Sequence, residues 1–193
     1  MIFVLSTMAN QAARCNPAHE LDALIDRTAN GEQDAFALLY QRTNPAVYGL
    51  ALSYLKNSAE AEDIAQDTFV QIWHNAHRYQ HHGKPMAWIL TIARNLSLMR
   101  IRKQNHLQDL PQDVWESLAI ESPHLTTEDR AVLTAAFGVL SDQERRIILL
   151  HAVSGLKHRE IADLLELPLA TVLSKYHRAL KKLKNTLQGD ENQ

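Results

Sequence analysis

The chain of 193 residues is 46% hydrophobic, has a formal net charge of −2 and contains one cysteine, six glycines and six prolines. This length can bury one or two small cores, while the single cysteine excludes an internal disulfide and a zinc site built from several cysteines. No segment approaches the apolar length of a membrane span, and the apolar Met1–Leu5 is too short for a signal peptide. Because the total charge is small, binding to nucleic acid would have to come from local patches.

Charge and helical periodicity predict an all-α fold of two small helical domains joined by an acidic linker. Residues 57–67 are acidic, residues 83–108 carry five bases and no acid, and residues 104–129 carry six acids and no Lys or Arg. The predicted organisation is a disordered tail over 1–18, a first domain over 19–103, a linker over 104–125, a second domain over 126–188 and a tail over 189–193.

An amphipathic helix is predicted over residues 59–76, with one apolar side and one acidic side. The apolar side comprises Ala61, Ile64, Ala65, Thr68, Phe69, Ile72 and Ala76. The polar side comprises Glu60, Asp63, Asp67, Gln71 and His74. On helix physics alone this side is a solvated face; the alternative is a docking surface for a basic partner.

Four histidines, at positions 74, 77, 81 and 82, follow or end this helix and raise the alternative of a metal site. His77 and His81 are four residues apart, so they would share a face if the helix continued. Neither a His-Glu-x-x-His pattern nor partnering cysteines accompany them. We therefore expect no metal and no cofactor.

A second helix, over residues 85–103, combines apolar, aromatic and basic side chains, with Pro85 suited to its first position. Its bases offer contacts to phosphates, and its aromatic residues offer flat faces on which an unpaired base can stack. Trp88 also fits the apolar core face. The candidate nucleic-acid residues are Tyr79, Lys84, Trp88, Arg94, Asn95, Arg100, Arg102 and Lys103.

The last quarter of the chain has the pattern of a helix-turn-helix. Ser141 and Glu144 form a capping-box signature before an apolar run that Gly155 ends. Helices are then predicted over 157–165 and 169–187, separated by a turn around Pro168. Two short helices at a tight turn can place the second helix in a major groove of DNA.

The second of these helices is expected to present an apolar side to the domain and a basic side to solvent. The apolar side comprises Val172, Tyr176, Ala179, Leu180 and Leu183. From Leu167 to Gly189 there are five bases and no acid, whereas an ordinary surface helix, which is the alternative, mixes charge signs. The candidate DNA-contacting residues of the two helices are His158, Arg159, Thr171, Leu173, Ser174, Lys175, His177, Arg178 and Lys181.

Together these blocks resemble a bacterial RNA polymerase sigma factor of the extracytoplasmic-function (ECF) type, in the sigma-70 family. The resemblance rests on four motifs in order, over about 150 residues: Asp34–Tyr40, Ala61–Trp73, Ala87–Asn95, and the pair Leu140–Arg145 and Arg159–Ala162. It implies that the acidic helix binds a coiled coil at the polymerase clamp through Glu62, Asp63, Gln66 and Asp67. It also implies that residues 79–103 read and melt the minus-ten promoter element, and that the helix-turn-helix reads the minus-thirty-five element.

Two positions depart from the family pattern. Met99 stands where the family usually has Asp, which puts the positions of Arg100 and Arg102 in doubt. Leu173 stands where the recognition helix often has Lys or Arg. A leucine can contact a thymine methyl group but cannot bridge the acceptor edge of guanine, so we expect an altered minus-thirty-five preference.

The sequence therefore predicts an alternative sigma factor rather than an enzyme, because no phosphate-binding loop or nucleophile motif is present. The implied partners are core RNA polymerase, through its clamp coiled coil and its flap, promoter DNA and an anti-sigma factor, with no small-molecule substrate. The location is expected to be cytoplasmic, with sequestration at the membrane by an anti-sigma factor as one form of control. The alternative function is a stand-alone helix-turn-helix regulator, which would bind duplex DNA without polymerase.

Overall fold

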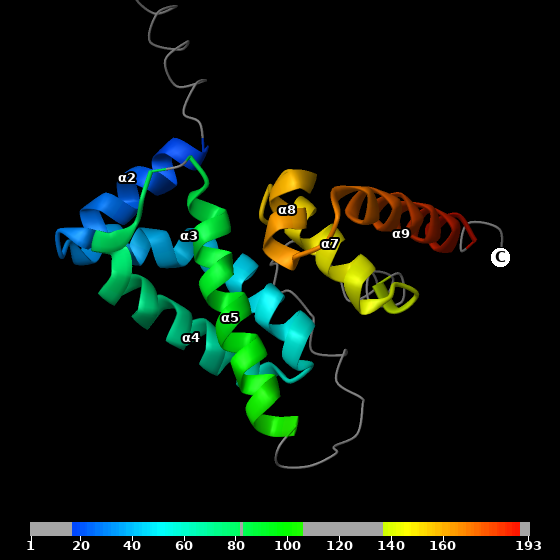
Figure 1. Ribbon diagram of the computed structural model, residues 1–193, viewed down its shortest axis with the longest axis horizontal. Coiled ribbons are helices and arrows are strands. Elements are labelled where there is room, and N and C mark those ends of the chain that lie inside the picture. The colour runs from blue at the N-terminus through cyan, green and yellow to red at the C-terminus, as the bar shows by residue number, and fades with distance from the viewer. Residues whose placement is uncertain (1–16, 82, 106–136, 190–193) are drawn as a thin grey trace, which may run out of the picture.

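The computed structural model describes residues 17–81, 83–105 and 137–189, and every regular element in these ranges is helical (Figure 1). The predicted all-α class is confirmed. The elements in chain order are α2 (Pro17–Ala29), α3 (Gln33–Leu55), α4 (Ser58–Asn75), the 3₁₀ turn η2 (Ala76–Arg78), α5 (Pro85–Asn105), α7 (Asp142–Ala152), α8 (His158–Leu165) and α9 (Leu169–Gly189).

Helices α2, α4 and α5 pack around the long helix α3. All seven residues predicted for the apolar side of α4 are buried, which confirms that helix and its orientation. The side chain of Asn57 caps α4 by accepting a hydrogen bond from the backbone N–H of Glu60 at 3.1 Å. Because its apolar side is buried, α4 exposes its acidic side to solvent.

Helices α7 to α9 form the helix-turn-helix part of the molecule. The capping box at Ser141 and Glu144 is present in both directions, with bonds of 2.9 and 3.3 Å. Gly155 follows the end of α7 with a φ of +66°, a conformation that favours glycine. Glu166 ends α8 at a φ of +56°, and α9 begins directly after Pro168.

The predicted helices 59–76, 85–103, 157–165 and 169–187 agree with α4, α5, α8 and α9 to within two residues at each end. Helix α2 begins at Pro17, two residues before the predicted first domain, and the linker after residue 105 lies outside the described residues. The domain boundaries therefore stay predictions. No helix within the described ranges is long and apolar enough to cross a membrane.

The prediction that Leu180 of α9 faces the core is wrong. Leu180 is 42% exposed, whereas Val172 and Ala179 are fully buried and Tyr176 and Leu183 are half-buried. Helix α9 extends away from the rest of the molecule beyond α7 (Figure 1). Its buried apolar stripe is therefore narrower than the five-residue side predicted, because among the described helices it packs mainly on α7 and α8.

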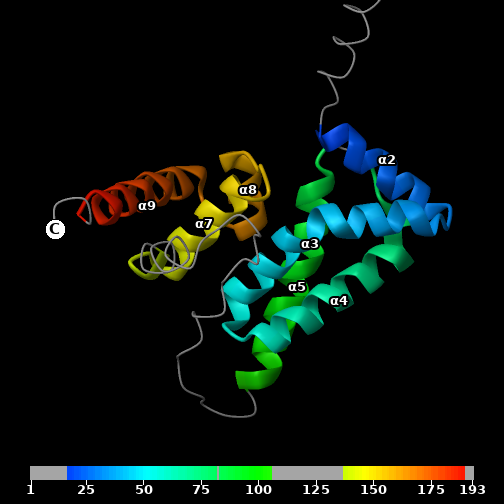
Figure 2. The ribbon, with the colours of Figure 1, turned by 180° about the vertical axis from the view of Figure 1, so that it is seen from behind.

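The helix-turn-helix part packs against the first helices, with α7 beside α3 and α8 beside α5 (Figure 2). A single hydrophobic cluster runs from α2 through α5 and continues into α7, α8 and α9. Where α3 meets α7, Gly49 lies so close to Leu149 that a Cβ atom on the glycine would stand 3.1 Å from a methyl group of that leucine.

Candidate nucleic-acid and partner interfaces

The acidic side of α4 is an open surface. Glu62, Asp63, Gln66 and Asp67 are all exposed, on one face of a helix whose opposite face is buried. Behind this face the rings of α3 and α4 pack edge to face, with Phe36 5.1 Å from Trp73 and 6.3 Å from Phe69 between ring centres. The carboxylates are therefore mounted on a rigid support rather than on a loop.

An ion pair and an electrostatic effect connect residues of this acidic surface to α5 and α3. Arg100 of α5 lies 4.0 Å from the carboxylate of Asp63. Burial, together with the negative charge of Glu62, raises the pKa of the Tyr48 hydroxyl. The structure thus brings the four predicted docking residues together on one face and places the predicted DNA residue Arg100 beside it.

The segment between η2 and α5 is held by α2. The hydroxyl of Tyr79 donates a hydrogen bond of 2.5 Å to Asp22, and Nε2 of His81 lies 2.8 Å from the carboxylate of Asp26. Burial and the hydrogen bond to Asp22 raise the pKa of Tyr79. Sequence reasoning missed Asp22 and Asp26, because 57 residues separate Asp22 from Tyr79 and no local pattern connects them.

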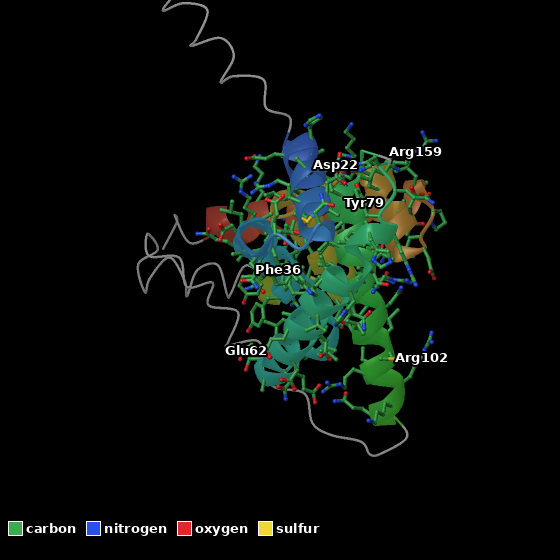
Figure 3. The ribbon with its side chains drawn as sticks, turned by 90° about the vertical axis from the view of Figure 1, so that its left-hand side faces the viewer. Asp22, Phe36, Glu62, Tyr79, Arg102 and Arg159 are labelled. Atoms are coloured by element: carbon green, nitrogen blue, oxygen red, sulfur yellow. The ribbon has the colours of Figure 1, made fainter. Side chains whose placement is uncertain are left out.

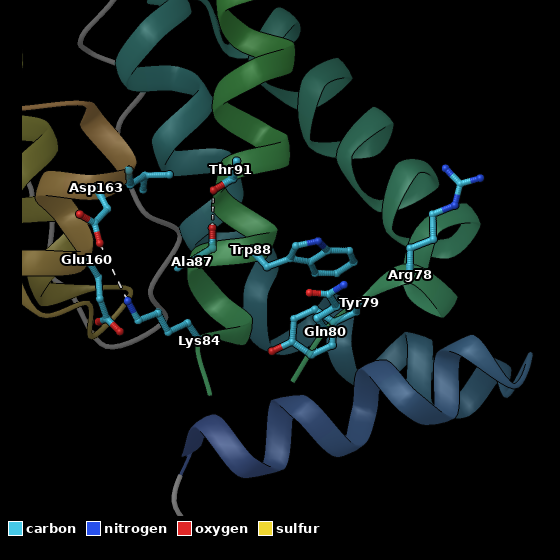
Figure 4. A pocket seen from close by; sticks show the side chains of 10 residues that line it. Arg78, Tyr79, Gln80, Lys84, Ala87, Trp88, Thr91, Glu160 and Asp163 are labelled. Atoms are coloured by element: carbon cyan, nitrogen blue, oxygen red, sulfur yellow. Dashed lines mark hydrogen bonds and ion pairs between the residues drawn. The ribbon is translucent and has the colours of Figure 1, made fainter. Parts of the chain in front are cut away.

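The aromatic residues of the predicted minus-ten surface meet. The rings of Tyr79 and Trp88 lie 4.9 Å apart and tilted by 51°, and Trp88 is half-buried against the core cluster. Both line a cavity of about 420 Å³ (Figure 4). Lys84 and Thr91 line it from the same domain, and α8 closes the other side with Glu160, Asp163 and Leu164.

The basic residues of α5 differ in exposure. Asn95, Arg102 and Lys103 are exposed, whereas only 13% of the Arg94 side chain is exposed and its Nε has no hydrogen-bond partner among the described residues. Met99, at the departure from the family pattern, is 62% exposed and so leaves an apolar side chain on this surface. Arg94 is the one predicted contact of α5 that another part of the chain largely covers.

Helix α9 presents the predicted basic face. Leu173, Ser174, His177, Arg178 and Lys181 are exposed, and Thr171 and Lys175 are half-buried. Arg178 is oriented by weak hydrogen bonds of 3.4 Å to the backbone carbonyl and to the hydroxyl of Ser174. Seven predicted residues of this helix thus share one side, with Arg159 of α8 exposed as well.

His158 is placed differently from its neighbours. Its ring stacks on His151 at 4.6 Å and meets the edge of Tyr176 at 4.5 Å, and its Nε2 is buried without a hydrogen-bond partner among the described residues. Burial, together with electrostatic interaction with the His151 and His177 rings, lowers its pKa. His158 therefore packs at the α8–α9 joint, and a contact to DNA by this residue stays a prediction.

Apart from Arg100, which lies 4.0 Å from Asp63, labelled residues of the acidic and basic surfaces lie apart from one another. In Figure 3 Glu62 lies at one edge of the helical body, while Tyr79, Arg102 and Arg159 lie toward the opposite edge. The electrostatic character of α4 thus differs from that of the exposed sides of α5 and α9, which carry the basic residues.

The histidines do not converge. The suggestion that His77 and His81 share a helix face is wrong, because the helical turn ends at Arg78. His81 pairs with α2 instead, and His82 lies outside the described residues. Across the described ranges no three His, Cys, Asp or Glu side chains are placed to hold a metal ion.

Comparison with known proteins identifies the class of protein that these surfaces define. The family model for sigma-70 region 2 matches residues 39–107, and the model for sigma-70 region 4 matches residues 130–183. An ECF RNA polymerase sigma factor SigK of Mycobacterium sp. (strain KMS) is 31% identical over 176 residues, covering 87% of this chain and 91% of the relative. SigK of Mycobacterium tuberculosis (strain ATCC 25177 / H37Ra) is also 31% identical, over 180 residues, covering 87% and 94%.

Two solved structures share the fold. CnrH in complex with the cytosolic domain of CnrY has a TM-score of 0.57 and 26% identity, covering 89% of this chain and 99% of that one. RpoE of Bartonella quintana, in complex with the anti-sigma factor NepR, has a TM-score of 0.63 and 24% identity, covering 79% and 96%. The chain belongs to the ECF RNA polymerase sigma factors of the sigma-70 family. It is an alternative sigma factor, which directs RNA polymerase to a particular set of promoters.

Proposed function

We propose that this sigma factor divides its task between three surfaces: α4 docks on core polymerase, the 79–103 segment reads and melts the minus-ten element, and α8–α9 reads the minus-thirty-five element. The observation that carries the proposal is the separation of charge, with four exposed polar and acidic residues on α4 and an exposed face without acid on α9. Opposite charge on separate faces suits simultaneous binding of a basic protein surface and of a DNA backbone.

In this proposal the residues that bind core polymerase are Glu62, Asp63, Gln66 and Asp67. Their carboxylates and amide can accept hydrogen bonds from Arg and Lys side chains of a coiled coil, and charge-assisted bonds of this kind are stronger than neutral ones. The apolar face of α4 stays in the core during docking, so the helix can bind as a preformed element with little ordering cost.

In this proposal the minus-ten element binds at the cavity and at the basic residues around it. The tilted pair Tyr79 and Trp88 offers π-faces against which an unstacked base can rest, and Lys84 and Arg94 offer charge to the adjacent phosphates. Asp22 acts as a positioning residue, because its hydrogen bond holds the Tyr79 ring. Asn95, Arg102 and Lys103 extend the basic surface along the exposed side of α5.

In this mechanism the factor lowers the free energy of promoter recognition and strand opening, and it makes and breaks no covalent bond itself. Bases captured in an unstacked position offset part of the few kcal/mol that unstacking costs. Polymerisation remains with the core enzyme, so the factor works where polymerase and chromosome are, in the cytoplasm.

An anti-sigma factor is the further partner that we infer. The solved structure of CnrH is that of a complex with the cytosolic domain of a second protein, CnrY, and the present chain has the same fold. Its open surface on α4, with rings of α3 behind it, is of the kind that a partner can cover.

The experiment that tests the function is run-off transcription from a genomic promoter library, with purified core polymerase and with or without this protein. We expect new, specific transcripts only when both proteins are present, and weak binding of promoter duplex by the factor alone. A folded protein that neither binds core polymerase nor yields transcripts, but binds duplex DNA tightly, would instead identify a stand-alone helix-turn-helix regulator.

Replacing Leu173 with arginine is expected to change base preference in the minus-thirty-five element toward guanine. Leu173 is 37% exposed on the basic side of α9, and a bidentate contact to guanine discriminates by about 1–3 kcal/mol, or roughly 5- to 150-fold. Selection of randomised minus-thirty-five sequences by holoenzyme measures the shift. Lys184→Arg, in the same helix but nearer its end, serves as the control. An unchanged preference in Leu173→Arg would mean that this position does not face bases.

A further inference from the structure

The segment that joins η2 to α5 carries an aromatic ring proposed to receive a base, yet regular structure holds little of it. Tyr79 follows the 3₁₀ turn in an extended conformation, with a φ of −63° and a ψ of 130°, and its backbone N–H bonds to the carbonyl of Ala76 at 3.0 Å. Gln80 and His81 belong to no helix. The position of this segment therefore depends mainly on contacts made by its side chains.

Two acidic residues of α2 make such contacts. Asp22 accepts a hydrogen bond of 2.5 Å from the hydroxyl of Tyr79, and the carboxylate of Asp26 lies 2.8 Å from Nε2 of His81. Nδ1 of the same imidazole lies 4.0 Å from Asp22, so both ring nitrogens of His81 face carboxylates of α2. An ionised carboxylate only accepts hydrogen bonds, so Nε2 of His81 donates to Asp26.

The two carboxylates are held in place by the buried side of their helix. Leu21, Leu24 and Ile25 of α2 lie in the hydrophobic core that this helix shares with α3 and α5. Asp22 and Asp26 are four residues apart, a spacing at which like charges weaken an isolated helix. The pair therefore does nothing for α2 itself, and its favourable contacts are those with Tyr79 and His81.

The ring of Tyr79 is located from three directions. Its hydroxyl bonds to Asp22, the ring of Trp88 lies 4.9 Å away at a tilt of 51°, and the ring of His81 lies 5.3 Å away at 73°. Asp22 and Tyr79 lie close together in Figure 3. A binding group has to be held to within about 0.5 Å and 10–20° of its productive geometry. A base that rests against Tyr79 and Trp88 thus depends on the contacts with α2.

We propose that α2 is a selectivity element of the minus-ten reader, in which Asp22 and Asp26 act through Tyr79 and His81 as positioning residues that set which base is preferred. The inference rests on the base-stacking role proposed for Tyr79 and Trp88. It extends that role to a helix outside the segment that the region 2 model matches, residues 39–107. Neither carboxylate touches DNA. When these contacts are lost, the ring moves and different bases bind with more similar affinities, because selectivity is a difference between affinities.

Substitutions on both sides of the contacts test the proposal. Asp22→Leu and Asp26→Ala remove the acceptors. Asp22→Asn and Asp26→Asn remove the charges but keep an oxygen that can accept a hydrogen bond. Tyr79→Phe keeps the ring and deletes only the hydroxyl, so it tests the bond to Asp22 from the opposite side.

The matched control is Glu20→Ala in the same helix. Among the described residues Glu20 pairs with Arg42 of α3, at 2.6 Å, and not with the 79–81 segment. Like Asp26→Ala, this variant removes one negative charge and one side-chain contact from α2. It therefore reports what the charge of the helix contributes by itself.

The first measurement is base preference in run-off transcription by holoenzyme. The promoter carries a minus-ten element that wild-type holoenzyme has selected from a randomised pool, and this element is then changed one base at a time. We expect the ratio of transcript from the selected element to transcript from a changed one to fall about 3- to 10-fold in Asp22→Leu, Asp26→Ala and Tyr79→Phe, which is part of the roughly 5- to 150-fold that stacking of one base contributes.

The remaining variants have defined expectations in the same assay. The Asn variants should stay within about twofold of the wild-type ratio, because an acceptor oxygen is kept. Asp22→Leu/Tyr79→Phe should lose no more than either single variant, because both delete the same bond. Glu20→Ala should match the wild type.

The second measurement is amide hydrogen exchange of residues 79–81 in the free factor, which reports the anchoring without polymerase or DNA. Exchange should be faster in Asp22→Leu, Asp26→Ala and Tyr79→Phe and unchanged in Glu20→Ala. Circular dichroism verifies that each variant is folded. If Asp22→Leu unfolds, Tyr79→Phe and Asp26→Ala decide.

Three results would overturn the proposal. One is an unchanged base preference in these variants, whether or not exchange becomes faster. Another is an equal loss of transcription from every promoter, which marks a purely structural role. The third is the same change in Glu20→Ala, which would attribute the effect to the charge of α2.

Tyr79→Ala separates these failures from a failure of the proposed function. If Tyr79→Ala changes base preference while the α2 variants do not, Tyr79 meets a base without help from α2, and only the further proposal fails. If Tyr79→Ala also leaves base preference unchanged, the stacking role of Tyr79 fails and the selectivity role of α2 fails with it.

Discussion

Charge reversal on α4, by Asp63→Lys or Asp67→Lys, is expected to reduce specific transcription at least 100-fold. Both carboxylates are exposed on a helix held by its buried side, so the substitutions leave the fold intact while they place a cation against a basic partner. A like charge set against a partner's charge costs several kcal/mol, and each 1.4 kcal/mol is tenfold in affinity.

Comparing Asp63→Lys with Asp67→Lys separates an effect on polymerase docking from an effect on α5. Asp63 also lies 4.0 Å from Arg100, so its reversal affects a predicted DNA residue, whereas Asp67 has no such ion pair among the described residues. For both variants, run-off assays measure specific transcription and co-purification measures binding to core polymerase. Asp34→Lys is the control outside α4. Equal transcription by Asp67→Lys and the wild type would exclude α4 as the docking helix.

Replacing Glu144 with glutamine is expected to lower the stability of the helix-turn-helix domain by about 2–3 kcal/mol at pH 7. Glu144 is 4% exposed, accepts a hydrogen bond of 2.7 Å from Lys182 of α9 and closes the capping box of α7. Hydrogen bonds to a charged group contribute about 1.5–3 kcal/mol, and a cap contributes about 1 kcal/mol. Urea unfolding followed by circular dichroism measures the loss.

The pH dependence of this effect has a definite sign. Burial alone raises the pKa of Glu144, but the hydrogen bonds from Lys182 and Ser141 outweigh burial and lower the pKa from 4.5 to about 2. Because the pKa in the folded state lies below that of the unfolded chain, the stabilisation is complete above pH 4.5 and is lost as the pH falls toward 2. The wild type should therefore lose stability over this window, and Glu144→Gln should lose less.

The matched control is Glu160→Gln in α8. Glu160 also accepts a hydrogen bond from the backbone at the start of its helix, at 2.8 Å from the N–H of Lys157, but it is less buried than Glu144 and no lysine of another helix bonds to it in the described structure. We expect a loss of less than about 1 kcal/mol there. Comparable losses in the two variants would show that the ion pair between α7 and α9 adds nothing beyond the cap.

The helices that carry function were predictable because each contains a complete local signal. The apolar period of α4, the capping box of α7, the glycine after α7 and the proline before α9 all act within a few residues. The same holds for the exposed acids of α4 and the bases of α9. Leu180 was misplaced because the width of a buried stripe depends on how many neighbouring helices cover it, which periodicity does not reveal.

Features that depend on distant residues were not predictable in the same way. Helix α3 runs from Gln33 to Leu55 through Pro45, although proline removes a backbone donor and usually ends or kinks a helix; packing against α2, α4, α5 and α7 keeps it continuous. The bond between Asp22 and Tyr79 likewise joins residues far apart in sequence. Asp163 and Glu166 look like ordinary solvated acids until α8 is seen beside α5.

The covered state of Arg94 has a consequence for non-specific attraction to DNA. A chromosome offers about 10⁶–10⁹ non-specific sites, which attract any exposed basic surface through its phosphates. The ion pair between Arg94 and Glu166, at 3.1 Å, leaves the Arg94 side chain only 13% exposed, so this cation adds little to the basic surface that such phosphates can reach.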